Sequence, residues 1–372
     1  GVVLIRGYEP LDIVRLPVID GRDDQVDEPK AAEMIDLAYR SGVNYFDTAW
    51  GYHNGQSELT AGRCLSSYPR ESYYLATKFP GYDPSNMGKV EEIFEEQLKK
   101  CQTPYFDFYL FHNVYEGNID DYLDPKFGIL AYLLKQKENG RIKHLGFSAH
   151  GSAEVIRRFL DAYGAHMEFC QLQVNYMDWH FQEAEKKVAL LAEAGLPVWV
   201  MEPLRGGKLA KASAEMTAEM QAMRPTETVP AWAFRFLQTI PNVTMVLSGM
   251  SSLEQLQENL ATWEADKPLN KDELDRLLRR TDEETKLGGL PCTRCHYCTS
   301  HCPKKLPIPE LIALYNEHKL TGGGFLAPMA VGSMPSDRRP ANCIGCRSCE
   351  QVCPQRIKIS EMMKEFSGMI GM

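Results

Sequence analysis

The chain reads Cys292-Thr-Arg-Cys295-His-Tyr-Cys298-Thr-Ser-His-Cys302-Pro303 near its C-terminal end, and the same spacing returns in Cys343-Ile-Gly-Cys346-Arg-Ser-Cys349-Glu-Gln-Val-Cys353-Pro354. Each stretch has the form C-x₂-C-x₂-C-x₃-C-P. Three thiolates on one tight loop can reach three irons of a single [4Fe–4S] cube, whereas the displaced fourth cysteine, followed by proline, ligates the other cube. The spacing therefore predicts two [4Fe–4S] clusters.

This pattern is similar to that of bacterial two-cluster ferredoxins. We assign one cluster to Cys292, Cys295, Cys298 and Cys353, and the second cluster to Cys302, Cys343, Cys346 and Cys349. Zinc sites and a disulfide framework are the alternatives, but zinc sites normally use isolated C-x₂-C pairs. The three remaining cysteines match no motif and are predicted to be buried structural thiols: Cys64, Cys101 and Cys170.

A predicted helix, Ile308–Leu320, separates the two cysteine runs and makes this domain larger than a minimal ferredoxin. Pro309 lies at its start, and Leu311, Leu314 and Tyr315 share one face. We expect this face to be available for docking on the larger domain.

The charge of the chain is unevenly distributed. From Pro291 onward there are 10 Lys and Arg against 6 Asp and Glu, so the first 290 residues carry a net charge of −13 and the whole chain −9. This balance argues against a general nucleic-acid binder. No apolar run approaches the length of a membrane span. Thiolate ligands favour a reducing compartment, and Gly1–Ile5 does not resemble a secretory leader, so we expect a cytoplasmic protein.

The first 290 residues alternate between apolar runs and amphipathic segments. The predicted strands are Ile13–Leu16, Asn44–Phe46, Tyr73–Thr77, Phe106–Phe111, His144–Phe147, Phe169–Val174, Val198–Met201 and Thr244–Leu247. The predicted helices are Pro29–Arg40, Lys89–Lys100, Phe127–Lys137, Ala153–Ala162, Gln182–Ala194 and Leu253–Leu260, the last preceded by a capping box at Ser251-x-x-Glu254.

This alternation predicts an α/β fold, a closed (β/α)₈ TIM barrel, with a doubly wound open sheet as the alternative. No G-x-G-x-x-G follows a strand, which argues against a Rossmann domain. A charged helical connector is predicted at Asp266–Leu287. We therefore expect a barrel over residues 1–288 and a small, mainly helical, ferredoxin-like iron–sulfur domain over residues 289–372.

Polar residues follow the predicted strands, where a barrel gathers its chemistry. Asp47, Lys78 and His112 end three consecutive strands, and Tyr52 follows Asp47 closely. Each residue alone also has a purely structural explanation. Asp47 could cap a helix and Lys78 could be solvated. His112 could be a hydrogen-bonded core histidine, and Tyr52 a packing aromatic. Together they suit carbonyl reduction, because the alkoxide left by hydride transfer needs a proton. A lysine ammonium lowers the pKa of a neighbouring tyrosine, and a histidine can orient the carbonyl oxygen.

At this point the sequence resembles the aldo-keto reductase family over residues 11–262. The matching pieces are Asn44–Ala49 with Tyr52, Ala76–Lys78, Tyr109–His112, Leu145–Ser148, Gln171-x₃-Asn175, Glu202–Gly207, Leu247–Gly249 and Glu258-Asn259. With the cysteine tail, the chain is similar to the iron–sulfur branch of that family. The resemblance implies an NAD(P)H-dependent oxidoreductase with the catalytic tetrad Asp47, Tyr52, Lys78 and His112.

The resemblance also implies where the nicotinamide cofactor binds. Ser148 and Gln171 would hold the carboxamide, and the helix start at Ser251–Asn259 would receive the adenosine phosphate end, as a helix N-terminus favours. The full set of implied cofactor-binding residues is Ser148, Gln171, Met201, Leu204, Gly206, Gly249, Ser251, Gln255, Glu258 and Asn259. Three residues depart from the family pattern: Met201 replaces a stacking tyrosine, Gln255 an arginine and Gly249 a lysine. The choice between NADP(H) and NAD(H) therefore stays open, with Arg205 or Lys208 as compensating cations.

The two domains allow three functions. The first is an enzyme that interconverts a small carbonyl compound and an alcohol, with clusters that exchange electrons with an external carrier or through a flavin. The second is the same enzyme with purely structural clusters. The third is a nicotinamide-binding redox sensor with little turnover. No flavin motif is present to split a hydride pair into single electrons, and an intact tetrad favours the two enzymes.

Overall fold

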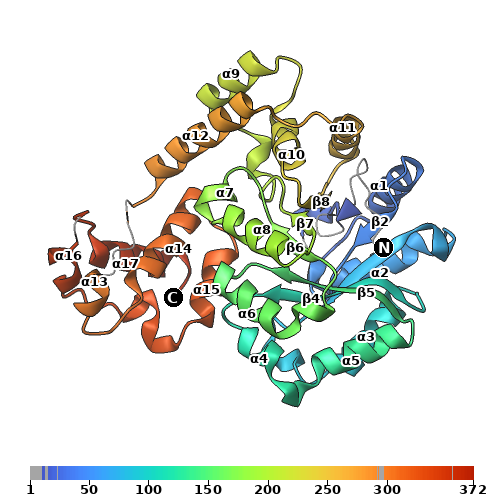
Figure 1. Cartoon of the computed structure of the whole chain (residues 1–372), viewed down its shortest axis with the longest axis horizontal. Helices are drawn as coiled ribbons and strands as arrows, with labels where there is room; N and C mark the ends of the chain where they lie inside the picture. Colours follow the sequence, from blue (N-terminus) through green and yellow to red (C-terminus); the bar gives the residue numbers. More distant parts are fainter. Residues whose placement is uncertain (1–10, 13–15, 23, 291, 293–296, 354) are drawn as a thin grey trace. The chain divides into compact units, whose positions relative to one another are not determined.

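The computed structural model describes residues 11–372, except 13–15, 23, 291, 293–296 and 354. The chain divides into two compact units, Gly1–Leu277 and Leu278–Met372. Figure 1 shows the first unit in blue to orange and the second in orange to red.

A parallel sheet of eight strands forms the centre of the first unit, and each strand pairs with the next along the chain. The strands are β1 Leu11–Asp12, β2 Tyr45–Asp47, β3 Tyr74–Phe79, β4 Phe106–Val114, β5 Ile142–Ala149, β6 Cys170–Gln173, β7 Val198–Met201 and β8 Val243–Val246. Parallel neighbours need long crossovers, which helices supply here. This architecture is the predicted (β/α)₈ barrel.

Helices connect the successive strands, and α11 and α12 follow the last strand, β8 (Figure 1). The helices of this unit are α1 Glu28–Arg40, α2 Gln56–Leu65, α3 Val90–Lys100, α4 Ile119–Leu123, α5 Ile129–Glu138, α6 Ala153–Tyr163, α7 Asp178–Phe181, α8 Ala184–Glu193, α9 Ala214–Met223, α10 Val229–Gln238 and α11 Leu253–Trp263; α12 Lys271–Gly288 crosses into the second unit. No described helix is both long and apolar enough to cross a membrane.

Most predicted elements agree with the structure to within three residues at each end. The predicted strand Ile13–Leu16 falls mainly on positions outside the described residues, and the described strand that pairs with β2 is Leu11–Asp12. Phe127 does not belong to α5 as predicted. It ends a separate 3₁₀ turn, because Gly128 adopts a left-handed conformation with φ 61°.

The predicted capping box at Ser251 is displaced by one residue. The N-cap of α11 is Ser252, whose hydroxyl accepts a hydrogen bond from the backbone N–H of Gln255. The Gln255 side chain in turn accepts from the backbone N–H of Ser251 at 2.8 Å. The side chain that completes the capping box is therefore that of Gln255 and not that of Glu254. Together the Ser252 and Gln255 side chains accept from two N–H donors at the start of the helix.

The predicted connector Asp266–Leu287 becomes helical at Lys271. Its start is set by a reciprocal pair: Asn270 accepts from the backbone N–H of Glu273 at 3.0 Å, and Glu273 accepts from the backbone N–H of Asn270 at 2.8 Å. This is a capping box in a position that the sequence reading had not identified.

Aromatic side chains fill the interior beneath the C-terminal ends of the strands. Phe169 and Trp199 stack with ring centroids 3.8 Å apart, and Tyr45 and Phe108 pack around them. Gly146 permits this packing, because a Cβ atom there would lie 2.6 Å from the Phe169 ring. Side chains two residues further along a strand lie on the same face of the sheet. Asp47 and Gln171 therefore lie directly above Tyr45 and Phe169, and the polar residues Lys78 and His112 lie further along β3 and β4 on the same face as Ala76 and Phe108.

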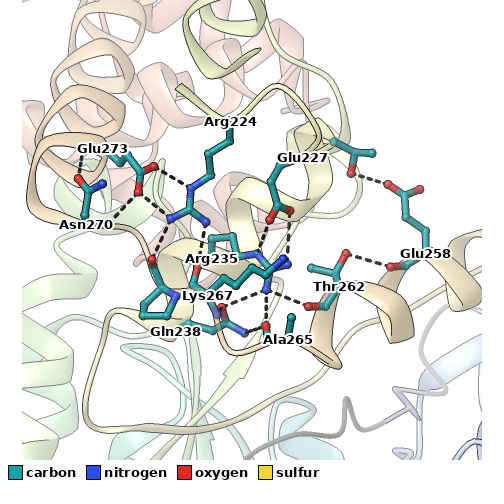
Figure 2. A network of polar contacts seen from close by, with 12 residues as sticks. Arg224, Glu227, Arg235, Gln238, Glu258, Thr262, Ala265, Lys267, Asn270 and Glu273 are labelled. Atoms are coloured by element: carbon teal, nitrogen blue, oxygen red, sulfur yellow. Dashed lines mark hydrogen bonds and ion pairs between the residues drawn. The ribbon is translucent and has the colours of Figure 1, made fainter. Parts of the chain in front are cut away.

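A network of polar contacts joins the helices α9 to α12 (Figure 2). Arg224 pairs with Glu273 and donates to the carbonyl of Lys267. Arg235, only 3% exposed, pairs with Glu227 and donates to backbone carbonyls at the end of α11. These contacts fix α11 against α10.

We predict that Arg235→Met lowers the free energy of unfolding of the barrel by about 3 kcal/mol, because a largely buried carboxylate and two carbonyls lose their partner. Arg158→Met is the matched control. Arg158 is 47% exposed and its partner Asp120 84%, so we expect a change within about 0.5 kcal/mol. Urea unfolding followed by tryptophan fluorescence measures both, and equal losses for the two variants would contradict the role of the network.

The second unit is small and mainly helical. Its helices are α13 Tyr297–Ser300, α14 Ile308–Leu320, α15 Leu326–Ser333, α16 Ser348–Gln351 and α17 Ile359–Met369. The predicted helix Ile308–Leu320 is confirmed. Its Leu311 and Tyr315 are buried in the core of this unit, and Leu314 packs against that core. The apolar face predicted for docking is thus used within the unit itself.

Candidate active site

A buried ion pair lies at the C-terminal ends of β2 and β3. The Lys78 ammonium contacts the Asp47 carboxylate, and each side chain is at most 2% exposed. Lys78 also donates to the carbonyl of Thr48 at 2.9 Å. The second carboxylate oxygen of Asp47 accepts from the Tyr45 hydroxyl at 2.9 Å and from the Gln171 amide at 2.6 Å. The lysine is therefore held in a fixed position.

Tyr52 lies directly beside this lysine. It begins a 3₁₀ turn, Tyr52–Gly55, in the loop after β2. Its hydroxyl is 3.3 Å from the Lys78 ammonium nitrogen, which lies 4.8 Å from the centre of the tyrosine ring. Tyr52 is only partly buried. A small molecule from solvent can therefore reach its hydroxyl, which at the same time contacts the buried Lys78 ammonium.

His112 completes the group at the end of β4. Its ring meets Tyr52 edge to face, with centroids 5.8 Å apart. Burial, and then the charges of Lys78 and His150, hold the pKa of His112 well below its usual 6.5. The imidazole is therefore neutral, and its buried Nδ1 has no hydrogen-bond partner among the described residues. The structure thus brings together the four predicted residues Asp47, Tyr52, Lys78 and His112.

Tyr82 is a neighbour that sequence reasoning missed. It meets His112 edge to face from the loop after β3, with ring centroids 5.1 Å apart. Its hydroxyl lies 2.3 Å from where a Cβ atom on Gly51 would be, so the residue before Tyr52 must be small or Tyr82 must move. Burial, helped by Glu58 and Asp83, raises the pKa of Tyr82 to about 12.

A second polar layer lies behind the lysine, around Glu58 on α2. Glu58 is fully buried and accepts from Thr77 and Gln97, at 2.7 Å each, and from Lys100. Gln97 also donates to the carbonyl of Lys78 at 3.0 Å. Burial raises the pKa of Glu58 despite these partners. The layer ties the backbone that carries Lys78 to helices α2 and α3.

Ser148 and Gln171, predicted to hold the nicotinamide carboxamide, are both buried and already bonded. The Ser148 hydroxyl accepts from the backbone N–H of Asn113 at 2.8 Å. Gln171 donates to Asp47, as described above. Gln173 lies on the same face of β6, one layer closer to the C-terminal end, and is 8% exposed. Strand alternation was the signal that could have identified it.

The last residue of β7 and the loop after it include three of the predicted cofactor residues. Met201 and Leu204 are partly buried, and Gly206 is exposed with φ 66°. Arg205 does not face the solvent: it is 4% exposed, and its Nε lies 3.0 Å from both carboxylate oxygens of Asp178. Lys208 and Lys211 are exposed cations of this loop.

Asp178 holds that loop to the end of β6. It accepts from Gln173 and Asn175, at 2.7 Å each, besides contacting Arg205. Asn175 also donates to the carbonyl of Glu202 at 3.1 Å. The positive φ angles of Glu202 and Arg205, 54° and 49°, are thus held by buried contacts.

The remaining predicted cofactor residues lie around β8 and α11. Gly249, Ser251, Gln255 and Glu258 are exposed. Asn259 is buried and donates to Ser248 at 3.2 Å. Gln255 bonds Ser251 as described above, and Glu258 accepts from Thr228 at 2.6 Å (Figure 2).

Four cysteines line a cavity in the second unit, whose volume is about 330 Å³ including the part open to solvent. Cys302 comes from the first run, and Cys343, Cys346 and Cys349 come from the second. Burial, Glu350 and the neighbouring Cys302 and Cys343 raise the pKa of Cys349 to about 12. Four soft thiol ligands around one space have the chemistry that a [4Fe–4S] cube requires, and they are the four that spacing assigns to the second cluster.

The first predicted cluster is described in part. Cys298 is buried in the core of the unit, Cys292 and Cys353 pack against that core, and Cys295 lies outside the described residues. Among the described residues, no three His, Cys, Asp or Glu side chains group around a single metal ion; a four-iron cube spreads its ligands more widely.

The three other cysteines lie in the barrel. Cys101 and Cys170 are buried, as predicted, whereas Cys64 is only partly buried.

Comparisons with known proteins agree with both units. The family model described as "Aldo/keto reductase family" matches residues 18–279. The model described as "4Fe-4S dicluster domain" matches residues 291–357. Among curated proteins, the chain is 25% identical over 281 residues to the uncharacterized oxidoreductase YqkF of Bacillus subtilis, covering 68% of this chain and 89% of that protein. It is 24% identical over 279 residues to the NADH-specific methylglyoxal reductase of Escherichia coli, covering 63% of this chain and 83% of that protein.

Solved structures show the same barrel. The holo form of the aldo-keto reductase AKR11C1 from Bacillus halodurans covers 74% of this chain and 91% of its own length, with a TM-score of 0.59 and 23% identity. An aldo-keto reductase from Klebsiella pneumoniae in complex with NADPH covers 74% of this chain and 90% of its own length, with a TM-score of 0.58 and 21% identity. The chain is therefore an oxidoreductase that belongs to the aldo/keto reductase family and carries a 4Fe-4S dicluster domain at its C-terminal end.

Proposed function

We propose that this enzyme interconverts a small aldehyde or ketone and the corresponding alcohol with NADH or NADPH as hydride carrier. One observation carries the proposal: the Tyr52 hydroxyl lies 3.3 Å from a lysine ammonium that is buried and paired with Asp47. A proton donor with a fixed cation beside it is what the forming alkoxide needs.

The chain's own residues would manage the proton and the carbonyl oxygen. Tyr52 donates its proton to that oxygen as negative charge develops there. The Lys78 ammonium stabilises the charge that passes to the tyrosine oxygen, and Asp47 keeps the ammonium in place. Neutral His112 orients the carbonyl by a hydrogen bond. A bound nicotinamide supplies the hydride.

The residues at the C-terminal ends of the strands fit a nicotinamide dinucleotide. Gly206 and Gly249 are exposed and carry no side chain that would obstruct it, and Lys208 offers a cation to its phosphates. Neither Gln255 nor the buried Arg205 presents a cation to a 2′-phosphate, so we propose that NADH and NADPH bind with similar affinity.

The neutral state of His112 gives a test by pH. Because its pKa is well below 6.5, we predict no break in kcat/KM from this residue between about pH 5.5 and 7.5. The unfolded chain takes up a proton at about pH 6.5 whereas the folded chain does not, so the free energy of unfolding should fall as the pH drops below that value. A break near pH 6.5 that disappears in His112→Gln would contradict the prediction.

We further propose that the dicluster domain holds two [4Fe–4S] clusters that exchange single electrons with an external carrier. Clusters that only brace the domain are the second candidate, supported by the burial of Cys298 in its core. The cysteine chemistry supports a reducing, cytoplasmic location.

Turnover and cluster colour test these proposals together. The purified protein is mixed without oxygen with NADH or NADPH and a panel of small aldehydes and ketones, methylglyoxal included. Oxidation of the nicotinamide supports the carbonyl activity, and its absence with every substrate contradicts it. If an added one-electron oxidant leaves dithionite-reduced clusters reduced, the bracing role is favoured.

A further inference from the structure

The cavity of the four cysteines reaches solvent through a small group of exposed residues. Of the residues that line the cavity, Pro303, Lys304, Ile344, Cys346 and Arg347 are exposed; we call these five the cluster rim. Ile344 is 60% exposed, the highest value among the large apolar side chains that are exposed in the described residues. An isolated exposed isoleucine is ordinary, but this one lies between two predicted cluster ligands.

The local backbone directs these side chains outward. Gly345 and Arg347 both have positive φ, 68° and 60°, so the Cys343–Cys346 segment turns sharply. Arg347 is 62% exposed and lies 3.8 Å from Glu361, which is 56% exposed. An ion pair this exposed contributes little to stability, so it does not explain why a cation stands here.

One predicted ligand of the second cluster reaches the solvent. Cys346 is exposed, whereas Cys302 and Cys343 are partly buried and Cys349 is buried. Electrons can therefore enter or leave the second cluster at the rim beside Cys346.

We propose that the cluster rim is the docking surface for an acidic one-electron carrier protein. This rests on the proposed function, in that Cys302, Cys343, Cys346 and Cys349 must hold a cluster. The rim has the composition of a transient electron-transfer contact, with an apolar centre and flanking positive charge. The two exposed cations of the rim, Lys304 and Arg347, complement an acidic partner.

The electron step is simple. The reduced carrier loses one electron and the cluster gains it, changing from [4Fe–4S]²⁺ to [4Fe–4S]⁺. The reverse step oxidises the cluster. No bond forms or breaks, and no proton moves.

Two oxidants of opposite charge test the proposal on the unmodified protein. The dithionite-reduced protein is mixed in a stopped-flow cell with an acidic blue-copper protein or with a basic c-type cytochrome, both strong one-electron oxidants. We expect the acidic carrier to react at least tenfold faster at low salt, with a rate that is first order in carrier and falls as salt is added. The net charge of −9 predicts the reverse order, so preference for the basic carrier overturns the proposal. A rate independent of carrier concentration also overturns it, because a step within the chain would then govern access to the cluster.

Charge reversal on the rim tests its location. Lys304→Glu and Arg347→Glu should each slow the acidic carrier at least fivefold. Arg338→Glu makes the same change at an exposed position that does not line the cavity, and its rate should stay within twofold. Equal slowing by all three variants contradicts a defined rim. If a charge-reversal variant loses iron, Lys304→Gln and Arg347→Gln are measured in its place. We expect each of these to slow the reaction with the acidic carrier at least twofold. Wild-type rates in both would contradict the docking role of the rim.

A different result would show that the cations only balance the charge of the cluster. The variants would then shift the midpoint potential of the cluster while the salt dependence stayed at the wild-type value, and the proposal would be wrong. The assay contains neither nicotinamide nor carbonyl compound, so Tyr52→Phe should react at the wild-type rate. Failure of carbonyl reduction and failure of docking are thus separate results. A protein without iron would contradict the proposed clusters themselves.

Discussion

Tyr52→Phe is expected to lower kcat for carbonyl reduction by about 10²–10⁴-fold, because the variant lacks the proton donor while its lysine and aspartate stay in place. The affinity for nicotinamide, measured by fluorescence titration, should change less than threefold. The Lys78 ammonium keeps its contacts with Asp47 and Thr48, so the variant should fold normally. This separation of kcat from binding distinguishes a proton donor from a structural residue.

Tyr39→Phe is the matched control for this substitution. Tyr39 lies on α1, and its hydroxyl bonds Ser72 at 2.8 Å. Loss of that hydroxyl should leave kcat within twofold. If kcat of Tyr52→Phe is lowered by less than tenfold, the role of Tyr52 as proton donor is contradicted. Lys78→Met is a weaker experiment, because an unpaired buried Asp47 costs about 3–5 kcal/mol of stability.

Cys349→Ala is expected to lower the iron content from about eight to about four atoms per chain, because one cube loses a ligand. Cys302→Ala should remove the same cluster although it belongs to the other run, since both residues line one cavity. Iron analysis and low-temperature EPR of the reduced protein, purified without oxygen, check both variants.

Cys64→Ala is the control for the cysteine variants, because Cys64 lies in the barrel. It should change neither iron content nor colour. Zinc in place of iron in the unmodified protein would contradict the cluster assignment. Different EPR signals lost in Cys302→Ala and Cys349→Ala would contradict the crossed pairing of the two runs.

Local patterns predicted the positions of Asp47, Lys78 and His112 correctly, because parallel strands bring their ends to one edge and alternation places side chains on one face. Tyr52 lies outside any strand, and its position shortly after Asp47 made it a candidate. The crossed cysteine set follows from spacing alone, and the cavity lined by Cys302 with Cys343 agrees with it.

Long-range contacts account for what the sequence did not predict. Arg205 was a candidate for phosphate binding, but Asp178, 27 residues earlier, holds it in the interior. The sequence did not predict that Gln171 bonds Asp47 across the barrel. Glu58 lies on α2, a helix that the sequence analysis did not predict, and it is held in the interior by hydrogen bonds from Gln97 and Thr77.

Isotope transfer tests the central claim most directly. Deuterium at C4 of NADH or NADPH, on the transferring face, should appear on the carbinol carbon of the alcohol formed by the unmodified protein, with the hydroxyl proton taken from solvent. Tyr52→Phe should give the same labelled product at a rate at least a hundredfold lower. An alcohol without deuterium from either nicotinamide, or full-rate labelling by Tyr52→Phe, would contradict hydride transfer assisted by Tyr52.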